Sequence, residues 1–181
     1  MENKMVSFGG KAVDFTYQTP YGTTSTLSEK VKQAGKTYLI FLRYYGCTIC
    51  QLDIKAYRES YQKFLDKDAQ ILMVLQSDPA TISESISEKD LKLEVACDPN
   101  GELYQLYQVG AARSKLGLVS MKTIRKMQAA KKAGLEHGKY EGNELQLPAV
   151  FLLDSAMNVV YAHRGKSAGD MPEIADLLAK L

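Results

Sequence analysis

The chain of 181 residues contains no tryptophan, only three cysteines and only two histidines. Three cysteines cannot build a framework of structural disulfides, and such sparing use is typical of a reducing compartment. No apolar run approaches the roughly eighteen residues that a membrane-spanning helix needs. The first residues, Met1 to Met5, lack the apolar stretch and the small-residue cleavage site of an export signal. We therefore expect a cytoplasmic protein that does not cross a membrane.

The overall composition is that of an ordinary soluble protein. Hydrophobic residues make up 45% of the chain and charged residues 24%, which is usual for a globular domain. A chain of this length can bury a sizeable core without disulfides or metals. We expect residues 1–181 to form a single domain.

One pair of cysteines occupies a position that is typical of redox chemistry. Cys47 and Cys50 form a C-x-x-C motif between an apolar run at residues 37–42 and a helical pattern from residue 47 to about residue 66. The first turn of a helix presents unpaired N–H groups and a partial positive charge, so the pKa of a thiol at Cys47 should fall. Cys50 lies on the inward stripe of the same pattern, whereas Cys47 is expected at an exposed tip. The motif predicts an accessible attacking thiol backed by a more buried second thiol.

Two arginines and the third cysteine could contribute to the site around this pair. Arg43 stands four residues before Cys47, where it either supplies a cation to the thiolate or points outward and pairs with an acid. Arg164 follows a late predicted strand and either joins the site or lies on the surface. Cys97 ends another predicted strand and is either a resolving thiol or a small core residue.

The order of the predicted elements indicates an α/β fold. Strands are predicted at residues 12–17, 37–42, 71–75, 91–96, 148–153 and 158–162, and helices begin near residues 27, 47, 79, 102, 120 and 173. The central β-α-β units imply parallel strands, and the closing β-β-α unit implies an antiparallel edge. Active groups of such sheets lie beyond the carboxyl ends of the strands, where Cys47 is placed.

A strongly basic segment precedes the last two strands. Residues 111–140 hold eight Lys or Arg and one acid, a net charge of +7, so the rest of the chain carries −5. The segment is either a solvated helix face or, at residues 113–139, a docking surface for an acidic partner or anionic substrate. Its apolar stripe is too thin for a membrane helix. Nucleic acid is not expected, because no aromatic residue stands among these charges before Tyr140.

Five stretches of the chain carry a resemblance to a known family. They are residues 13–15, 41–50 (F-L-R-Y-Y-G-C-T-I-C), 98–104, 146–154 and 161–164. The chain resembles the AhpC/TSA-type redoxins, in the peroxiredoxin-like branch of the thioredoxin-fold superfamily, over roughly residues 12–180. The resemblance implies a thioredoxin-like α/β fold with a central mixed sheet flanked by helices. The order of the predicted elements adds an N-terminal β extension and a basic helical insertion at about residues 111–145, the part least well matched to the family. The resemblance also implies a cis peptide at Leu147–Pro148 that places Pro148 opposite the dithiol.

The dithiol itself falls between two family motifs. Peroxiredoxins carry P-x-x-x-[TS]-x-x-C, in which the last cysteine attacks peroxide. Over this sequence, that cysteine is Cys50, the Thr or Ser position is Cys47 and the Pro position is Arg43. Thioredoxins carry W-C-G-P-C and a buried acid on the preceding strand, and neither is present here.

Two enzymatic functions use the same residues, with Cys47, Cys50, Arg43 and Pro148 as the candidate site. The resemblance favours a peroxiredoxin-like antioxidant enzyme, in which one cysteine is oxidised by a peroxide to a sulfenic acid and the other condenses with it. The alternative is a thiol–disulfide oxidoreductase acting on protein or small-molecule disulfides. A lower alternative is a redox-sensing or docking module without turnover.

The sequence also limits which cofactors and reductants this reaction would use. A second C-x-x-C and histidines at metal-binding spacing are absent, so neither a metal nor an organic cofactor is implied. Turnover requires a reductant, either a thioredoxin-type protein or a low-molecular-weight thiol. Which cysteine attacks first and the oligomeric state are left open.

Overall fold

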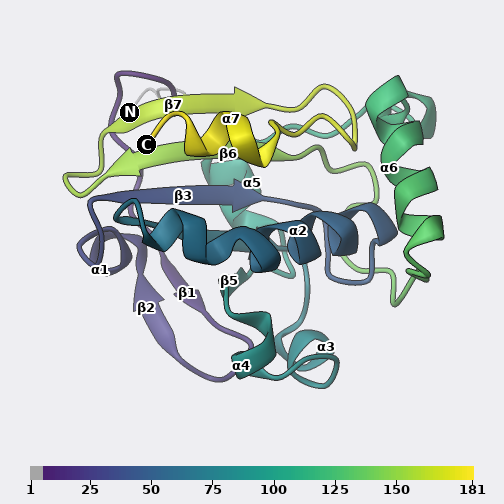
Figure 1. The fold of residues 1–181 in the computed structure, drawn as a ribbon, viewed down its shortest axis with the longest axis horizontal. Coiled ribbons are helices and arrows are strands. Elements are labelled where there is room, and N and C mark those ends of the chain that lie inside the picture. The colour runs from purple at the N-terminus through teal and green to yellow at the C-terminus, as the bar shows by residue number, and fades with distance from the viewer. Residues whose placement is uncertain (1–5) are drawn as a thin grey trace.

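A computed structural model describes residues 6–181 (Figure 1). Its centre is a seven-stranded sheet in the order β2-β1-β5-β4-β3-β6-β7. The strands are β1 Thr16–Gln18, β2 Thr24–Thr26, β3 Lys36–Phe41, β4 Ala69–Leu75, β5 Glu94–Cys97, β6 Ala149–Asp154 and β7 Val159–Arg164. Strands β3, β4 and β5 are parallel, and β6 and β7 extend the sheet antiparallel beyond β3. The predicted mixed α/β sheet is confirmed.

Helices cover both faces of this sheet. They are α1 Leu27–Val31, α2 Thr48–Leu65, α3 Pro79–Ser83, α4 Glu88–Leu91, α5 Glu102–Leu106, the 3₁₀ turn η1 Lys115–Leu118, α6 Met121–Lys132 and α7 Ile174–Leu178. Figure 1 shows α2 and α7 in front of the sheet, α5 behind it, and α6 beyond the carboxyl end of β3. Along the described chain, residues 6–181, the search for a helix able to span a membrane finds none.

The central strands are buried on both faces because they separate two apolar cores. Strand β4 is buried along its whole length, and β3 is buried from Thr37 onward. Side chains such as Tyr38, Ile40 and Met73 pack under α2 and α7. Their neighbours in the strands, such as Leu39 and Phe41, pack toward α1 and α5 on the other face. This alternation follows from the two-residue period of a strand, and it explains why these runs are almost continuously apolar.

The N-terminal extension is a short hairpin at one edge of the sheet. Strand β1 pairs antiparallel with β2, and Gln18 pairs with Cys97 on β5. The strand predicted over residues 12–17 was too long, because only Thr16–Gln18 forms a ladder. The capping box that opens α1 is present, with the Thr26 side chain accepting from the Glu29 N–H.

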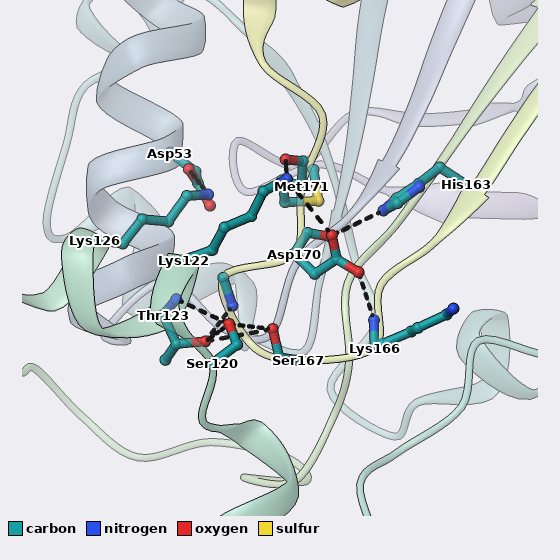
Figure 2. Close-up of polar contacts among 11 residues, drawn as sticks. Asp53, Ser120, Lys122, Thr123, Lys126, His163, Lys166, Ser167, Asp170 and Met171 are labelled. Carbon is teal, nitrogen blue, oxygen red and sulfur yellow. Dashed lines mark hydrogen bonds and ion pairs between the residues drawn. The ribbon is translucent and has the colours of Figure 1, made fainter.

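The basic helix α6 is fixed to its surroundings by polar contacts, as Figure 2 shows. Lys126 Nζ lies 2.6 Å from Asp53 Oδ1 on α2. Thr123 Oγ1 accepts from the Gly169 N–H at 3.0 Å, in the loop that follows β7. A Cβ at Gly169 would lie 2.6 Å from Thr123 N, so only glycine permits this close approach. The basic segment therefore packs against α2 and is not simply a solvated face.

Candidate functional site

The dithiol lies at the junction of β3 and α2, beyond the carboxyl end of the central strand. Cys47 is the N-cap residue of α2, and its Sγ accepts from the Cys50 N–H at 3.4 Å. The turn before it is held by the Cys47 N–H, which donates to Tyr44 O at 3.2 Å. A sulfur at the N-cap therefore faces the unpaired N–H groups of the first helical turn, as the sequence predicted.

Arg43 points into this site. Its Nη2 lies 2.9 Å from Cys47 Sγ, and its Nη1 donates to Glu144 O at 2.8 Å. The backbone carbonyl that anchors the guanidinium belongs to a segment about one hundred residues away in sequence. Of the two sequence interpretations, the cation beside the thiolate is the one that the structure shows, and the outward position is wrong.

The two thiols have opposite protonation tendencies. The hydrogen bond from the Cys50 thiol and the nearby Arg43 guanidinium lower the pKa of Cys47 from 9.0 to about 6, although burial opposes them. Burial in the core raises the pKa of Cys50, and the hydrogen bond it gives to Cys47 raises it further. At neutral pH Cys47 is therefore a thiolate and Cys50 a thiol that donates to it.

Cys47 is not the exposed residue that the sequence predicted. Its exposed fraction is 0% and that of Cys50 is 4%. Residues 135–141, which we call the strap, run between the left-handed glycines Gly134 and Gly142 and pack against the turn that carries Cys47. The Gly138 N–H donates to Gly46 O at 2.8 Å. The helical pattern of α2 could not reveal this cover, because it comes from a remote segment.

Glycine at position 46 is required by the strap. A Cβ there would lie 2.3 Å from Lys139 O, a distance that no packed structure tolerates. Gln51 ties the strap further, since its Nε2 donates to Gly46 O at 3.1 Å and to Glu136 O at 2.9 Å. The far end of the strap is also anchored, because the Glu141 carboxylate accepts from Thr81 Oγ1 at 2.8 Å and from the Asp78 N–H at 3.1 Å.

The cis peptide expected at Leu147–Pro148 is absent, because every peptide bond in residues 6–181 is trans. The Leu147 N–H donates to Gly110 O at 3.1 Å, and Ala111 forms a bridge with Gln146. This pairing keeps the chain extended up to the start of β6, a course that suits a trans bond. Pro148 is buried, and its carbonyl accepts from the Gly165 N–H.

Arg164 and Cys97 take no part in the contacts of the dithiol. Arg164 Nη2 donates to the carbonyls of Val6 and Tyr107, and its guanidinium lies 4.9 Å from the ring centre of Phe151. Cys97 is separated from β3 by β4 and packs against the core under α2. Burial, with the charges of Asp78 and Glu141, raises the pKa of Cys97 to about 12, so it stays a thiol.

A pocket beside the dithiol brings in residues that the sequence did not single out. It has a volume of 370 Å³ and is lined by Arg43, Thr48 and apolar side chains of α6 and η1. His137 also lines it, stacks on Tyr140 at 4.0 Å and lies 3.1 Å from Tyr44 Oη. The sequence carries no sign of the contact between Tyr44 and His137, because these residues lie about ninety positions apart. No cluster of ligands suited to a metal ion occurs within residues 6–181.

The fold recurs in solved structures of peroxiredoxins and related proteins. A peroxidoxin BcpB from Mycobacterium tuberculosis has a TM-score of 0.68 at 15% identity, covering 97% of this chain and 96% of that one. A peroxiredoxin-like protein from Aquifex aeolicus has a TM-score of 0.65 at 14% identity, with 97% and 86% covered. A putative thiol:disulfide interchange protein DsbE from Chlorobium tepidum has a TM-score of 0.57 at 22% identity, with 96% of each chain covered. At these identities the likeness establishes the fold alone.

The family follows from the sequence match. No curated protein sequence matches the chain. The family model of AhpC/TSA matches residues 8–162, which is most of the chain and includes both cysteines of the dithiol. The resemblance of the sequence is thereby confirmed, and the chain belongs to the AhpC/TSA family.

Proposed function

We propose that the chain is a peroxiredoxin-like reductase of peroxides in which Cys47 attacks and Cys50 resolves. One observation carries this assignment: Cys47 Sγ lies 2.9 Å from Arg43 Nη2 and 3.4 Å from the Cys50 N–H. A buried sulfur with two such donors and a lowered pKa is poised as a nucleophile. Membership of the AhpC/TSA family makes the protein a thiol-dependent redox enzyme.

The proposed reaction has two steps that balance. The Cys47 thiolate attacks the outer oxygen of a hydroperoxide, the O–O bond breaks, and with one proton the products are Cys47 sulfenic acid and an alcohol or water. The Cys50 sulfur then attacks the sulfenic sulfur, water leaves, and a Cys47–Cys50 disulfide forms. The i,i+3 spacing at a helix start brings the two sulfurs within reach of one another.

This assignment departs from the family motif, in which the position of Cys50 attacks. Cys50 lies on the buried face of α2, and its raised pKa keeps it protonated at neutral pH. A thiol in that state is a poor first nucleophile, and it keeps the hydrogen with which it donates a hydrogen bond to Cys47. Cys47 occupies the motif position of a Thr or Ser, so here the usual hydrogen-bonding hydroxyl is replaced by a second redox sulfur.

Arg43 supports the chemistry by charge. Its guanidinium stabilises the thiolate before attack, and the same cation is placed to stabilise the negative charge that develops on the departing oxygen. Pro148 is assigned the role of a positioning residue immediately before β6, where its carbonyl accepts from the Gly165 N–H. Regeneration of the dithiol requires a thioredoxin-type protein or a low-molecular-weight thiol.

The cellular setting of this enzyme is part of the proposal. We place it in the cytoplasm, where three cysteines without a structural disulfide framework suit a reducing environment. We also propose one domain over residues 1–181, with the insertion at about 111–145. Two apolar cores that share one sheet support that assignment.

A second candidate function is thiol–disulfide exchange, and one observation favours it. The lowered pKa belongs to the first cysteine of the C-x-x-C, the residue that attacks disulfides in that chemistry. The structure from Chlorobium tepidum with 22% identity carries a thiol:disulfide interchange name. The substrate would then be a disulfide, and the same Cys50 would resolve the mixed disulfide.

The two candidates are separated by offering the reduced protein each oxidant in turn. We expect hydrogen peroxide to oxidise the dithiol orders of magnitude faster than it oxidises free cysteine, and insulin disulfides to be reduced slowly. Rapid insulin reduction with slow peroxide oxidation would assign the exchange function instead. Slow reaction with both oxidants would leave only the non-catalytic sensing or docking module.

A further inference from the structure

Helix α6 packs against the protein with its large apolar side chains facing the solvent. Its buried residues are Thr123 and Ala130, whereas Met121 is 65% exposed and Met127 56% exposed. Ile124 is 40% exposed on the same side. An amphipathic helix on a protein surface normally buries such residues. This helix instead presents an apolar stripe that nothing in the described chain covers.

Polar contacts on the inward side of the helix hold it in this orientation. Lys126 forms the 2.6 Å ion pair with Asp53 on the side that faces α2. Thr123 Oγ1 also donates to Leu118 O. Ser120 Oγ accepts the Thr123 N–H as the N-cap, as Figure 2 shows. Rotating the apolar stripe inward would break these contacts and leave Asp53 buried and unpaired, which is costly. The outward stripe is therefore a property of the fold.

The stripe is part of a larger apolar area. Six of the nine large apolar side chains exposed in the described chain come from residues 116–140; they are Leu116, Val119, Met121, Ile124, Met127 and Tyr140. Concentration of this kind within one segment of 25 residues marks an interaction site, since exposed apolar residues are normally scattered singly.

Positive charge borders the stripe. Arg125, Lys131 and Lys132 are exposed on α6, and no ion pair within residues 6–181 involves them. The surrounding segment 111–140 carries +7 in a chain of net charge +2. We call Met121, Ile124, Arg125, Met127 and Lys131 the α6 face. Its chemistry is complementary to a surface that combines apolar groups with carboxylates.

The α6 face ends at the redox-active turn. Thr48, the residue that follows Cys47, lines the 370 Å³ pocket and a second pocket of 310 Å³. Met127 lines both pockets as well. A molecule bound on α6 therefore contacts Thr48, the residue next to Cys47.

We propose that the α6 face docks an acidic dithiol protein that reduces the Cys47–Cys50 disulfide, an inference that rests on the proposed function. A thiolate of the partner attacks Cys47 Sγ and the Cys50 thiolate leaves. The second partner thiol then attacks the partner sulfur, which releases Cys47 as a thiolate and leaves the partner as a disulfide. From Met121 to Lys131 the face spans about 15 Å of helix, which a protein can cover and a small thiol cannot.

The test measures reduction of the oxidised protein by two reductants. The probes are a thioredoxin with net negative charge and dithiothreitol, which is small and neutral. In the double variant Arg125→Glu/Lys131→Glu we expect the second-order rate with the acidic thioredoxin to fall about tenfold or more at low salt, with the difference shrinking at high salt. The rate with dithiothreitol should stay within about twofold. The control Lys63→Glu/Lys67→Glu makes the same charge change on exposed residues at the far end of α2 and should keep both rates.

A second variant probes the apolar part of the face. Met121→Ser/Ile124→Ser removes no charge, and we expect a loss of about fivefold or more with the acidic thioredoxin at any salt concentration. Equal rates for the wild type and both variants would overturn the proposal. So would a charge variant whose only defect is lost binding to anionic phospholipid vesicles, because the face would then serve a membrane surface. Failure of the peroxide reaction in the wild type would instead refute the proposed function, and the dithiothreitol rate reads out the dithiol separately.

Discussion

At the scale of single residues, the site shifts the pKa values of two cysteine side chains in opposite directions. Cys47 gains the Cys50 hydrogen bond and the Arg43 guanidinium, and these outweigh its burial. Burial raises the pKa of Cys50, and its hydrogen bond to Cys47 and the Cys47 charge raise it further. Arg43 can remain partly buried because Glu144 O and Cys47 Sγ each accept one of its donors. The hydrogen bond between the two thiols and the Arg43 guanidinium together make Cys47 the nucleophilic sulfur.

Replacing that arginine should therefore move the titration of Cys47. In Arg43→Gln we expect the pKa of Cys47 to rise from about 6 toward its ordinary value, by about one unit or more. Thiolate absorbance in the ultraviolet, followed against pH in a Cys50→Ser/Cys97→Ser background, measures it. Arg43→Lys should restore most of the shift. An unchanged titration in Arg43→Gln would show that Arg43 does not set the pKa of Cys47, and would leave that role to the helix start and the hydrogen bond from position 50.

At the scale of elements, the site depends on a connection that covers it. The strap touches the turn of Cys47 through Gly46 and Gly138, and Gln51 of α2 holds it by two hydrogen bonds. Residues 135–141 form no helix or strand and are mostly exposed, so we expect the strap to open at a lower free-energy cost than the sheet or α2. We therefore expect access of an oxidant to the buried sulfur to depend on the strap and not on the helix that carries the cysteines.

A single methyl group should displace the strap. In Gly46→Ala the new Cβ would lie 2.3 Å from Lys139 O, so we expect the strap to move and alkylation of Cys47 by iodoacetamide to speed up about tenfold. Gly110→Ala is the control, because a Cβ there meets no atom within 4 Å. Peptide mass mapping locates the alkylated residue. Identical rates in both variants would mean that the strap does not limit access.

At the scale of the whole molecule, the sequence predicted the architecture better than the surroundings of the site. The βαβ order and the apolar run of β4 depend on local periodicity, so the mixed sheet and the position of Cys47 were predictable. The burial of Cys47, the Arg43–Glu144 bond and the trans bond before Pro148 depend on residues 110–144 returning to the sheet. Contacts between segments so far apart in sequence leave no periodic signal.

The ionisation of the site also affects the stability of the whole chain. Because folding lowers the pKa of Cys47, the unfolded state binds more protons between pH 6 and 9, so the free energy of unfolding should rise with pH in that window. The rise, relative to Cys47→Ser, should be at most about 1.4 kcal/mol per pH unit. Cys50, whose pKa is raised, opposes this only at higher pH. Urea unfolding of the reduced proteins measures the difference, and a difference independent of pH would contradict the assigned thiolate.

The most direct test of the central claim is to locate the first oxidation by peroxide. Cys50→Ser and Cys47→Ser, each with Cys97→Ser, are mixed with hydrogen peroxide in a single turnover and analysed by intact mass and sulfenic acid trapping. Our account predicts rapid formation of a sulfenic acid on Cys47 in the Cys50→Ser protein and a rate near that of free cysteine in the Cys47→Ser protein. A fast sulfenic acid on Cys50 in the Cys47→Ser protein would contradict it and return the attacking role to the position that the family motif assigns.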